Sequence, residues 1–217
     1  MLIINFKTYK QSTGKQALEL AKKIELASKE KDVFVAIAAQ AVDLKELVRN
    51  VSLPLLAQHV DFEDFGGHTG SVNIGSVKQA GALGTLLNHS EKKLGFDVLK
   101  KTLQKCKKED LLTVVCAENV EEAKKIAELK PDFIAVEPPE LIGGDISVVD
   151  ADPNIIKKSV KEIKKIGEIP VLCGAGVKTS HDVSASLKLG AKGVLVASGV
   201  VKNEDPFKET LDLLRGF

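Results

Sequence analysis

The sequence lacks tryptophan, and aromatic residues make up only 4% of its 217 residues. Valine, isoleucine, leucine and alanine must therefore supply the hydrophobic core, which is typical of parallel strands that are buried on both faces. The formal net charge is only +1, from 31 basic and 30 acidic residues. This even balance argues against a broad surface for nucleic acid or for an anionic membrane.

Long apolar runs are also absent from the sequence. No stretch approaches the roughly 18 apolar residues that a membrane-spanning helix needs, and residues 1–10 lack the features of a secretory signal. The three cysteines, Cys106, Cys116 and Cys173, form no CxxC pair. We therefore expect reduced thiols, a cytoplasmic location and no membrane partner.

The chain alternates short apolar runs with longer amphipathic segments. The apolar runs predict eight strands, at residues 2–6, 33–38, 54–58, 84–88, 111–116, 133–136, 170–173 and 193–197. The amphipathic segments predict helices, most clearly at residues 15–28, 121–129, 154–166, 180–189 and 206–214. Strands that alternate with helices indicate a parallel sheet. The count of eight favours a closed (β/α)8 barrel over an open doubly wound sheet, as a single domain spanning residues 1–217.

In such a barrel the active site lies at the carboxyl ends of the strands, so the polar residues that follow each strand are the candidates. Asn5 and Lys7 follow the first strand, and the alternation of a strand points them to one side and Phe6 to the other. His89 follows the fourth strand and Glu137 the sixth. Taken singly, each has an ordinary structural explanation, such as a solvated lysine or a histidine that is only hydrogen-bonded.

Two of these candidates have informative neighbours. Ser90 begins a short helical segment, so His89 lies at its N-terminus, where the helix dipole disfavours a charged imidazole. Glu137 directly follows a buried apolar strand. Burial of a carboxylate there costs free energy unless the group is paired or has a function. Residues 138–144 then begin with two prolines and end with two glycines, a composition typical of a lid that excludes water from a ligand.

The seventh and eighth strands are followed by small residues. Gly174-Ala175-Gly176 follows the seventh and Ala197-Ser198-Gly199 the eighth. Loops of this kind let backbone N–H groups approach an anion, and a phosphate site after these two strands recurs in the fold. The two loops together indicate a phosphorylated ligand. Residues 61–76 form the one long irregular connection, which also suggests a functional loop.

Taken together, these residues resemble the triosephosphate isomerase family, in order and over the whole chain. The matching blocks are Asn-Phe-Lys after the first strand, Asn-His-Ser-Glu after the fourth, Val-Glu-Pro-Pro with its lid after the sixth, and the two phosphate loops. The short chain and the Pro-Pro-Glu-Leu-Ile-Gly lid are similar to the compact archaeal branch, whose members are often tetramers. The resemblance implies a TIM barrel that interconverts D-glyceraldehyde 3-phosphate and dihydroxyacetone phosphate through an enediolate, in glycolysis and gluconeogenesis, with no metal or organic cofactor.

The resemblance also implies a role for each candidate. Glu137 is expected to be the base, His89 the electrophile that polarises the carbonyl, Lys7 the positive charge beside the substrate, and Asn5 a residue that orients it. Glu91 is expected to support them. The residues expected to contact the triose phosphate are Asn5, Phe6, Lys7, Ile142, Gly143, Gly176, Ala197 and Ser198.

The sequence departs from the usual family pattern at three places. Gly144 stands where many relatives have threonine, Ala175 where many have serine, and Ser71 where glutamate is usual. Because the loop that holds Ser71 enters the neighbouring subunit in this family, Thr69 is expected at an interface of a dimer or tetramer. None of these departures touches the residues expected to move the proton.

Two other functions remain open on the sequence. Another phosphate-binding barrel enzyme, acting on a phosphoribosyl or indole-glycerol phosphate, would share the glycines of the last two loops. It would not be expected to combine Lys7, His89 and Glu137. A catalytically silent sensor of a phosphorylated ligand, or an assembly subunit, would have no need to retain all three, and a fold alone does not settle function.

Overall fold

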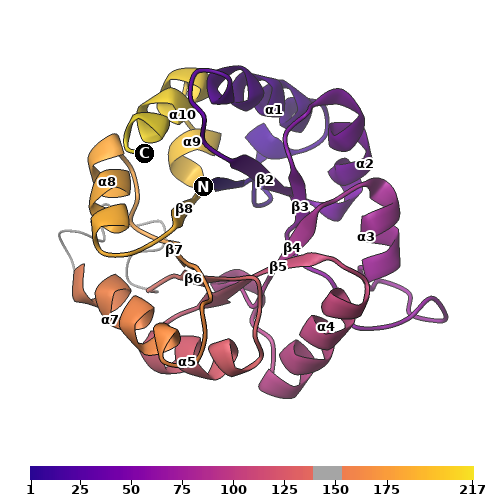
Figure 1. The fold of residues 1–217 in the computed structure, drawn as a ribbon. Coiled ribbons are helices and arrows are strands. Elements are labelled where there is room, and N and C mark those ends of the chain that lie inside the picture. The colour runs from indigo at the N-terminus through magenta and orange to yellow at the C-terminus, as the bar shows by residue number, and fades with distance from the viewer. Residues whose placement is uncertain (139–152) are drawn as a thin grey trace.

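The computed structural model describes residues 1–138 and 153–217, and its eight strands close into a parallel barrel in chain order (Figure 1). The strands are β1 (Leu2–Asn5), β2 (Val35–Ala39), β3 (Leu55–Ala57), β4 (Gly84–Leu87), β5 (Leu112–Ala117), β6 (Phe133–Val136), β7 (Val171–Cys173) and β8 (Gly193–Val196). Pairing of β1 with β8, with Leu2 opposite Val194, closes the ring. The predicted (β/α)8 barrel is confirmed, and the eight strands lie where the sequence placed them, with ends shifted by at most two residues.

Helices surround the barrel on the outside (Figure 1). Within the described residues these are α1 (Lys15–Ser28), α2 (Ala41–Asn50), α3 (Ile74–Ala80), α4 (Phe96–Lys108), α5 (Val120–Glu128), α7 (Pro153–Lys164), α8 (Ser180–Lys188), α9 (Ser198–Val201) and α10 (Pro206–Arg215), with 3-10 turns η1 (Lys10–Ser12) and η2 (Ser90–Lys92). The five helices that the sequence delimited are all present. The other four, α2, α3, α4 and α9, were not delimited in advance. No helix in the described ranges is long and apolar enough to cross a membrane.

The core has two layers, because alternate residues of each strand face opposite sides. The smaller cluster fills the inside of the barrel and contains inward-facing residues of every strand. Ile3, Leu86 and Leu172 belong to it. Leu2 and Ile4 belong to the larger cluster, which packs the outside of the barrel against the helices. This alternation decides which residues at the strand ends face the site.

Polar caps fix the loops on the rim of the barrel. Thr179 accepts a hydrogen bond from the N–H of Asp182, and the Asp182 carboxylate accepts from the N–H of Thr179, so α8 begins with a capping box. Asp182 also accepts from the N–H of Lys178, at 3.0 Å. This cap therefore holds the loop between β7 and α8, one of the two loops expected to bind phosphate.

The connection between β3 and α3 projects beyond the ring of helices (Figure 1). Its base is held where Asp61 accepts from the N–H of Val72, at 2.7 Å, and pairs with Asn73 as a bridge. Asn73 then caps α3 by accepting from the N–H of Ser76. The irregular stretch predicted at residues 61–76 was therefore too long by three residues, because α3 begins at Ile74.

Candidate active site

A cavity of about 390 Å³ opens at the carboxyl ends of the strands. Asn5, Lys7, His89 and Glu137 all line it, although they come from β1, β4 and β6. Gly176, Ala197 and Ser198 line the opposite part, from the loops after β7 and β8. The barrel thus brings together the residues that the sequence singled out at five separate strand ends.

Two other expected residues, Phe6 and Thr69, do not line the cavity. Phe6 is fully buried in the outer cluster and does not line the cavity, because it alternates with Asn5 and Lys7 and faces the helices. The expectation that its side chain contacts substrate finds no support in the structure. Thr69 is exposed in the loop between β3 and α3. Ile142 and Gly143, with most of the expected lid, lie outside the described residues.

The end of β1 holds Lys7 in an unusual conformation. Its φ of 48° lies in the left-handed region, which costs a non-glycine residue roughly 1–2 kcal/mol. The Asn5 side chain stabilises this turn by accepting from the N–H of Lys7 at 3.0 Å, and Gln58 donates to the Lys7 carbonyl at 2.9 Å. The Lys7 ammonium meets the Glu91 carboxylate at 2.8 Å. Lys7 is therefore fixed at the cavity wall, with a side chain only 11% exposed, rather than solvated.

His89 precedes η2, as the sequence suggested, and its ring takes part in the turn. Nδ1 accepts from the N–H of Glu91 at 3.1 Å, so a neutral ring carries its proton on Nε2. Burial lowers the pKa of His89, the charge of Lys7 lowers it further, and Glu91 opposes them. The ring therefore favours the neutral form, with its Nε2–H directed toward Glu137, whose Oε1 lies 3.6 Å from Nε2.

Glu137 is almost completely buried, with an exposed fraction of 3%. Burial raises its pKa to about 7, against the opposing effects of the Cys116 thiol and the Lys7 charge. Its Oε2 is buried and has no hydrogen-bond partner among the described residues. A carboxylate that is desolvated and incompletely paired accepts a proton readily near neutral pH.

Space for Glu137 depends on the start of the loop after β7. Gly174 donates its N–H to the Val136 carbonyl at 2.9 Å, so its backbone lies directly against the end of β6. A Cβ atom on Gly174 would stand 2.4 Å from Cγ of Glu137. The sequence placed Gly174 in a loop expected to bind phosphate through Gly176, and in the structure Gly174 itself lies against the buried carboxylate.

The loops after β7 and β8 form another part of the cavity wall. Gly176 has a φ of 67°, which glycine adopts without strain. Ala197 precedes α9 and Ser198 begins it. Because the first N–H groups of a helix have no partner within it, those of α9 are available to a ligand.

Comparison with known proteins agrees with this arrangement. A family model described as triosephosphate isomerase matches residues 1–214. The triosephosphate isomerase of Methanothermus fervidus is 45% identical over 215 residues, covering 99% of this chain and 97% of the relative. That of Archaeoglobus fulgidus is 46% identical over 217 residues, covering 100% and 97%. The chain belongs to the triosephosphate isomerase family.

The chain is therefore an isomerase of this family, and the alternative of a different phosphate-binding barrel enzyme is removed. A solved structure, the triosephosphate isomerase of Bartonella henselae, is similar with a TM-score of 0.74. It covers 99% of this chain and 95% of its own at 18% identity, which shows the shared fold. In the described part of the isomerase, no cluster of histidine, cysteine or acidic residues is arranged to hold a metal ion.

Four further residues that line the isomerase cavity were not predicted from the sequence. These are Tyr9, Lys178, Asn203 and Glu209. Lys178 stands two residues after Gly176, so its position beside a phosphate loop was a usable signal. Tyr9 likewise stands two residues after Lys7, whereas Asn203 and Glu209 come from segments farther from the strand ends, where no local pattern marks them. Asn203 donates to Glu209 at 3.0 Å, and the Lys202 ammonium lies 4.3 Å from the centroid of the Tyr9 ring.

Burial of Glu137 predicts a pH-dependent cost to stability. The carboxyl is neutral in both the folded and unfolded isomerase below its ordinary pKa of 4.5, and ionised in both above about 7. Stability is therefore lost as pH rises from 4.5 to 7, by up to about 3 kcal/mol. Glu137→Gln removes the charge. The free energy of unfolding of this variant, measured with urea at equal protein concentration, should therefore exceed that of the native isomerase by an amount that grows across this pH range. An advantage of the same size at pH 4 and pH 8 would contradict this account.

The close approach of Gly174 predicts a second effect. Gly174→Ala should displace the Glu137 carboxylate and lower kcat by about 10²-fold, since a misplacement of about 1 Å can cost that much. Gly67→Ala is the matched control, because a Cβ there meets nothing within 4 Å. Steady-state kinetics of the two folded variants checks the expectation. Normal turnover by Gly174→Ala would show that the carboxylate tolerates the shift.

Proposed function

We propose that Glu137, His89 and Lys7 carry out the family's reaction in this chain, the interconversion of D-glyceraldehyde 3-phosphate and dihydroxyacetone phosphate. The observation that carries the proposal is the pair formed by Glu137 and His89. A buried carboxylate with a pKa of about 7 lies 3.6 Å from the Nε2 of a histidine that burial keeps neutral. A base and a neutral hydrogen-bond donor side by side suit proton transfer next to a carbonyl.

The proposed steps follow from these positions. Glu137 removes a proton from the hydroxyl-bearing carbon next to the substrate carbonyl, while the Nε2–H of His89 polarises the carbonyl oxygen and transfers its proton to it. His89 then recovers a proton from the neighbouring hydroxyl oxygen, so that the imidazole returns to its neutral starting form. The negative charge that develops on the enediolate is stabilised by Lys7, whose ammonium is held at the cavity wall by Glu91. Glu137 then returns the proton to the neighbouring carbon. A pKa of about 7 suits a group that both accepts and releases a proton near neutral pH.

The phosphate of the substrate is proposed to lie at the loops after β7 and β8. Gly176 and Ser198 line the same cavity as Glu137 and would offer backbone N–H groups to the phosphate, while Lys7 adds positive charge. Ala197, just before α9, and Asn5, which holds the Lys7 turn, complete the contacts. Ile142 and Gly143 are proposed to close over the substrate. A closed lid protects the enediolate from water and from loss of phosphate.

Direct assay of the isomerisation, without added metal or cofactor, tests the proposal. Glu137→Asp should withdraw the carboxylate by about 1 Å and lower kcat by roughly 10²-fold with little change in KM. Near-normal turnover would show that Glu137 is not the base. A folded native chain that binds 2-phosphoglycolate but does not isomerise the substrate would instead be a silent sensor.

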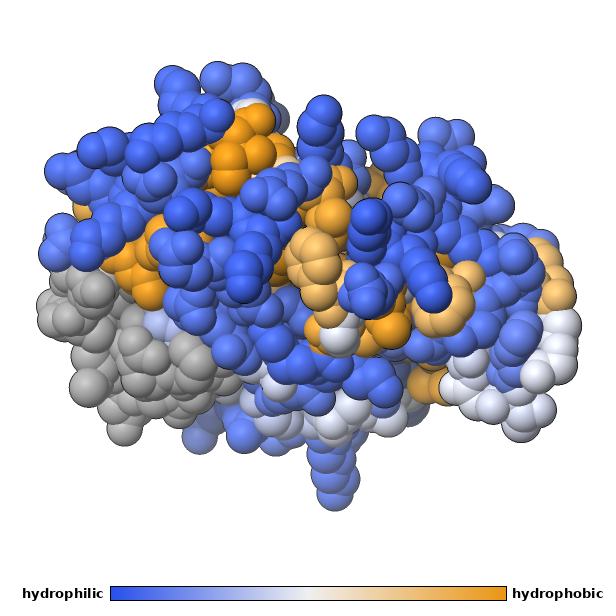
Figure 2. All heavy atoms as spheres, turned by 90° about the horizontal axis from the view of Figure 1, so that it is seen from below, coloured by the Kyte–Doolittle hydropathy of each residue, from blue (hydrophilic) through white to orange (hydrophobic). Residues whose placement is uncertain are grey.

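We also propose that the chain associates with itself, through the loop that contains Thr69, and works in the cytoplasm. The loop projects from the barrel, and its Phe65 is 68% exposed. Figure 2 shows a mostly hydrophilic face of the molecule on which hydrophobic residues are exposed in separate patches. The three cysteines are buried free thiols, which suits a reducing compartment.

Light scattering tests the association. The native chain should have the mass of a dimer or larger assembly, and Thr69→Arg should lower that mass because it places a charge on the projecting loop. Ser52→Arg is the control, at an exposed position away from this loop. A monomeric mass for the native chain would refute the proposal, and an unchanged mass for Thr69→Arg would refute the role of the loop.

A further inference from the structure

We propose that Glu122, on α5, is a positioning residue for His89 and Lys7. It lies outside the cavity wall and contacts neither of them, so it would act through the segment that joins β4 to α4. The inference rests on the proposed function, since it concerns how the groups named there are held.

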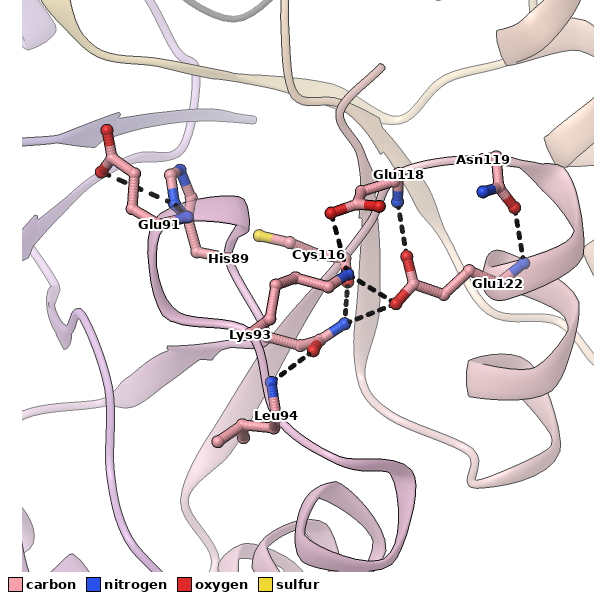
Figure 3. A network of polar contacts seen from close by, with 9 residues as sticks. His89, Glu91, Lys93, Leu94, Cys116, Glu118, Asn119 and Glu122 are labelled. Atoms are coloured by element: carbon pink, nitrogen blue, oxygen red, sulfur yellow. Dashed lines mark hydrogen bonds and ion pairs between the residues drawn. The ribbon is translucent and has the colours of Figure 1, made fainter. Parts of the chain in front are cut away.

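Glu122 connects two βα units (Figure 3). Its Oε1 accepts from the Lys93 ammonium at 2.6 Å and from the Asn88 side-chain amide at 3.0 Å. Its Oε2 accepts from the N–H of Glu118 at 2.7 Å, in the connection between β5 and α5. Lys93 also lies 3.4 Å from the Glu118 carboxylate. Residues on both sides of His89 are therefore tied to one carboxylate.

Asn88 shows why this segment needs an anchor. It precedes His89 directly, has a φ of 57° and is buried, with an exposed fraction of 2%. Such a left-handed conformation is tolerated by asparagine when its side chain bonds locally. The Asn88 amide donates to the Cys116 carbonyl at 2.9 Å as well as to Glu122, and its oxygen accepts from the N–H of Leu94 at 3.0 Å. The segment from 88 to 94 is thus closed on itself and fastened to β5.

Glu122 is itself rigidly placed and ionised. It stands in the first turn of α5, where its N–H donates to the Asn119 cap at 2.9 Å. Burial raises the pKa of Glu122, but the N–H of Glu118, Lys93 and Asn88 outweigh burial and leave the pKa below its ordinary value. A charged acceptor at a helix N-terminus is a strong anchor for three donors.

The anchored segment contains His89 and also Glu91, the residue that holds the Lys7 ammonium. The His89 ring is oriented by the N–H of Glu91, and the Glu91 carboxylate holds the Lys7 ammonium. A change in the path of residues 88–94 therefore moves the imidazole and the ammonium together. The phosphate loops after β7 and β8 have no part in this network, so loss of the anchor should affect the chemical step more than substrate binding.

The test is Glu122→Gln, compared with Glu121→Gln. Glutamine keeps the size of Glu122 but supplies one oxygen where the carboxylate supplies two, so at least one donor loses its partner. We expect kcat to fall about 10-fold, with KM changed less than about twofold. Glu121 is the matched control on the same helix, because its exposed carboxylate meets only Lys124 among the described residues. Glu121→Gln should leave both constants unchanged.

A second measurement separates positioning from loss of stability. The ¹⁵N shifts of the His89 ring should report an unprotonated Nδ1 and a protonated Nε2 in the native isomerase and in Glu121→Gln. In Glu122→Gln the two tautomers should mix, since the turn that fixes the ring is loosened. An unchanged kcat, or a lowered kcat with native His89 shifts, would overturn the proposal.

Two further variants test the inference if Glu122→Gln does not fold and separate it from the proposed role of His89. If Glu122→Gln does not fold, Lys93→Met removes one of the three donors and should show a smaller loss of kcat with the same change at His89. Native values in Lys93→Met would then overturn the inference. Full activity in His89→Gln would refute the proposed role of His89 itself, whereas an inactive His89→Gln beside a normal Glu122→Gln would refute only the positioning.

Discussion

The active site depends on the burial of one carboxylate, that of Glu137, at the end of β6. Desolvation of an acidic group opposes its charge, and here it raises the pKa to about 7. Burial also lowers the pKa of the adjacent His89, because it disfavours the positive charge of the imidazolium. One physical cause thus raises the pKa of the carboxyl and lowers the pKa of the imidazole. Burial thereby favours a neutral imidazole beside a carboxyl whose pKa is about 7.

Closure of the barrel makes this burial possible. Glu137 donates its N–H to Ala117 on β5, and Gly174 after β7 donates to Val136 on β6, so the carboxylate stands between two neighbouring strands. The rim is linked in the same way elsewhere: Gln58 donates to Lys7, and Asn88 to Cys116. Each of these segments is held by a strand or loop of another unit of the ring, and no single loop forms the site alone.

The sequence was sufficient for the fold and for the main candidates, because alternation of strand and helix is a local signal. Once the strands are counted, the barrel itself brings Lys7, His89 and Glu137 to one rim. The side chain of Phe6 lies in the outer cluster because its place in the alternation turns it toward the helices. The contact of Gly174 with Glu137 and the network around Glu122 were not foreseen, since both arise from packing between separate units.

The same distinction explains how stability and function are divided within each strand. Residues that face the helices need only be apolar and of suitable size, whereas the last inward-facing positions must place polar groups within a few ångströms of one another. Asn5 accepts from Lys7 at 3.0 Å across a left-handed turn, and Asn88 stabilises a second left-handed turn beside His89. Each strained backbone position next to a catalytic candidate is thus paired with an asparagine that stabilises it. Strained backbone of this kind clusters at functional sites, where the surrounding structure holds it in place.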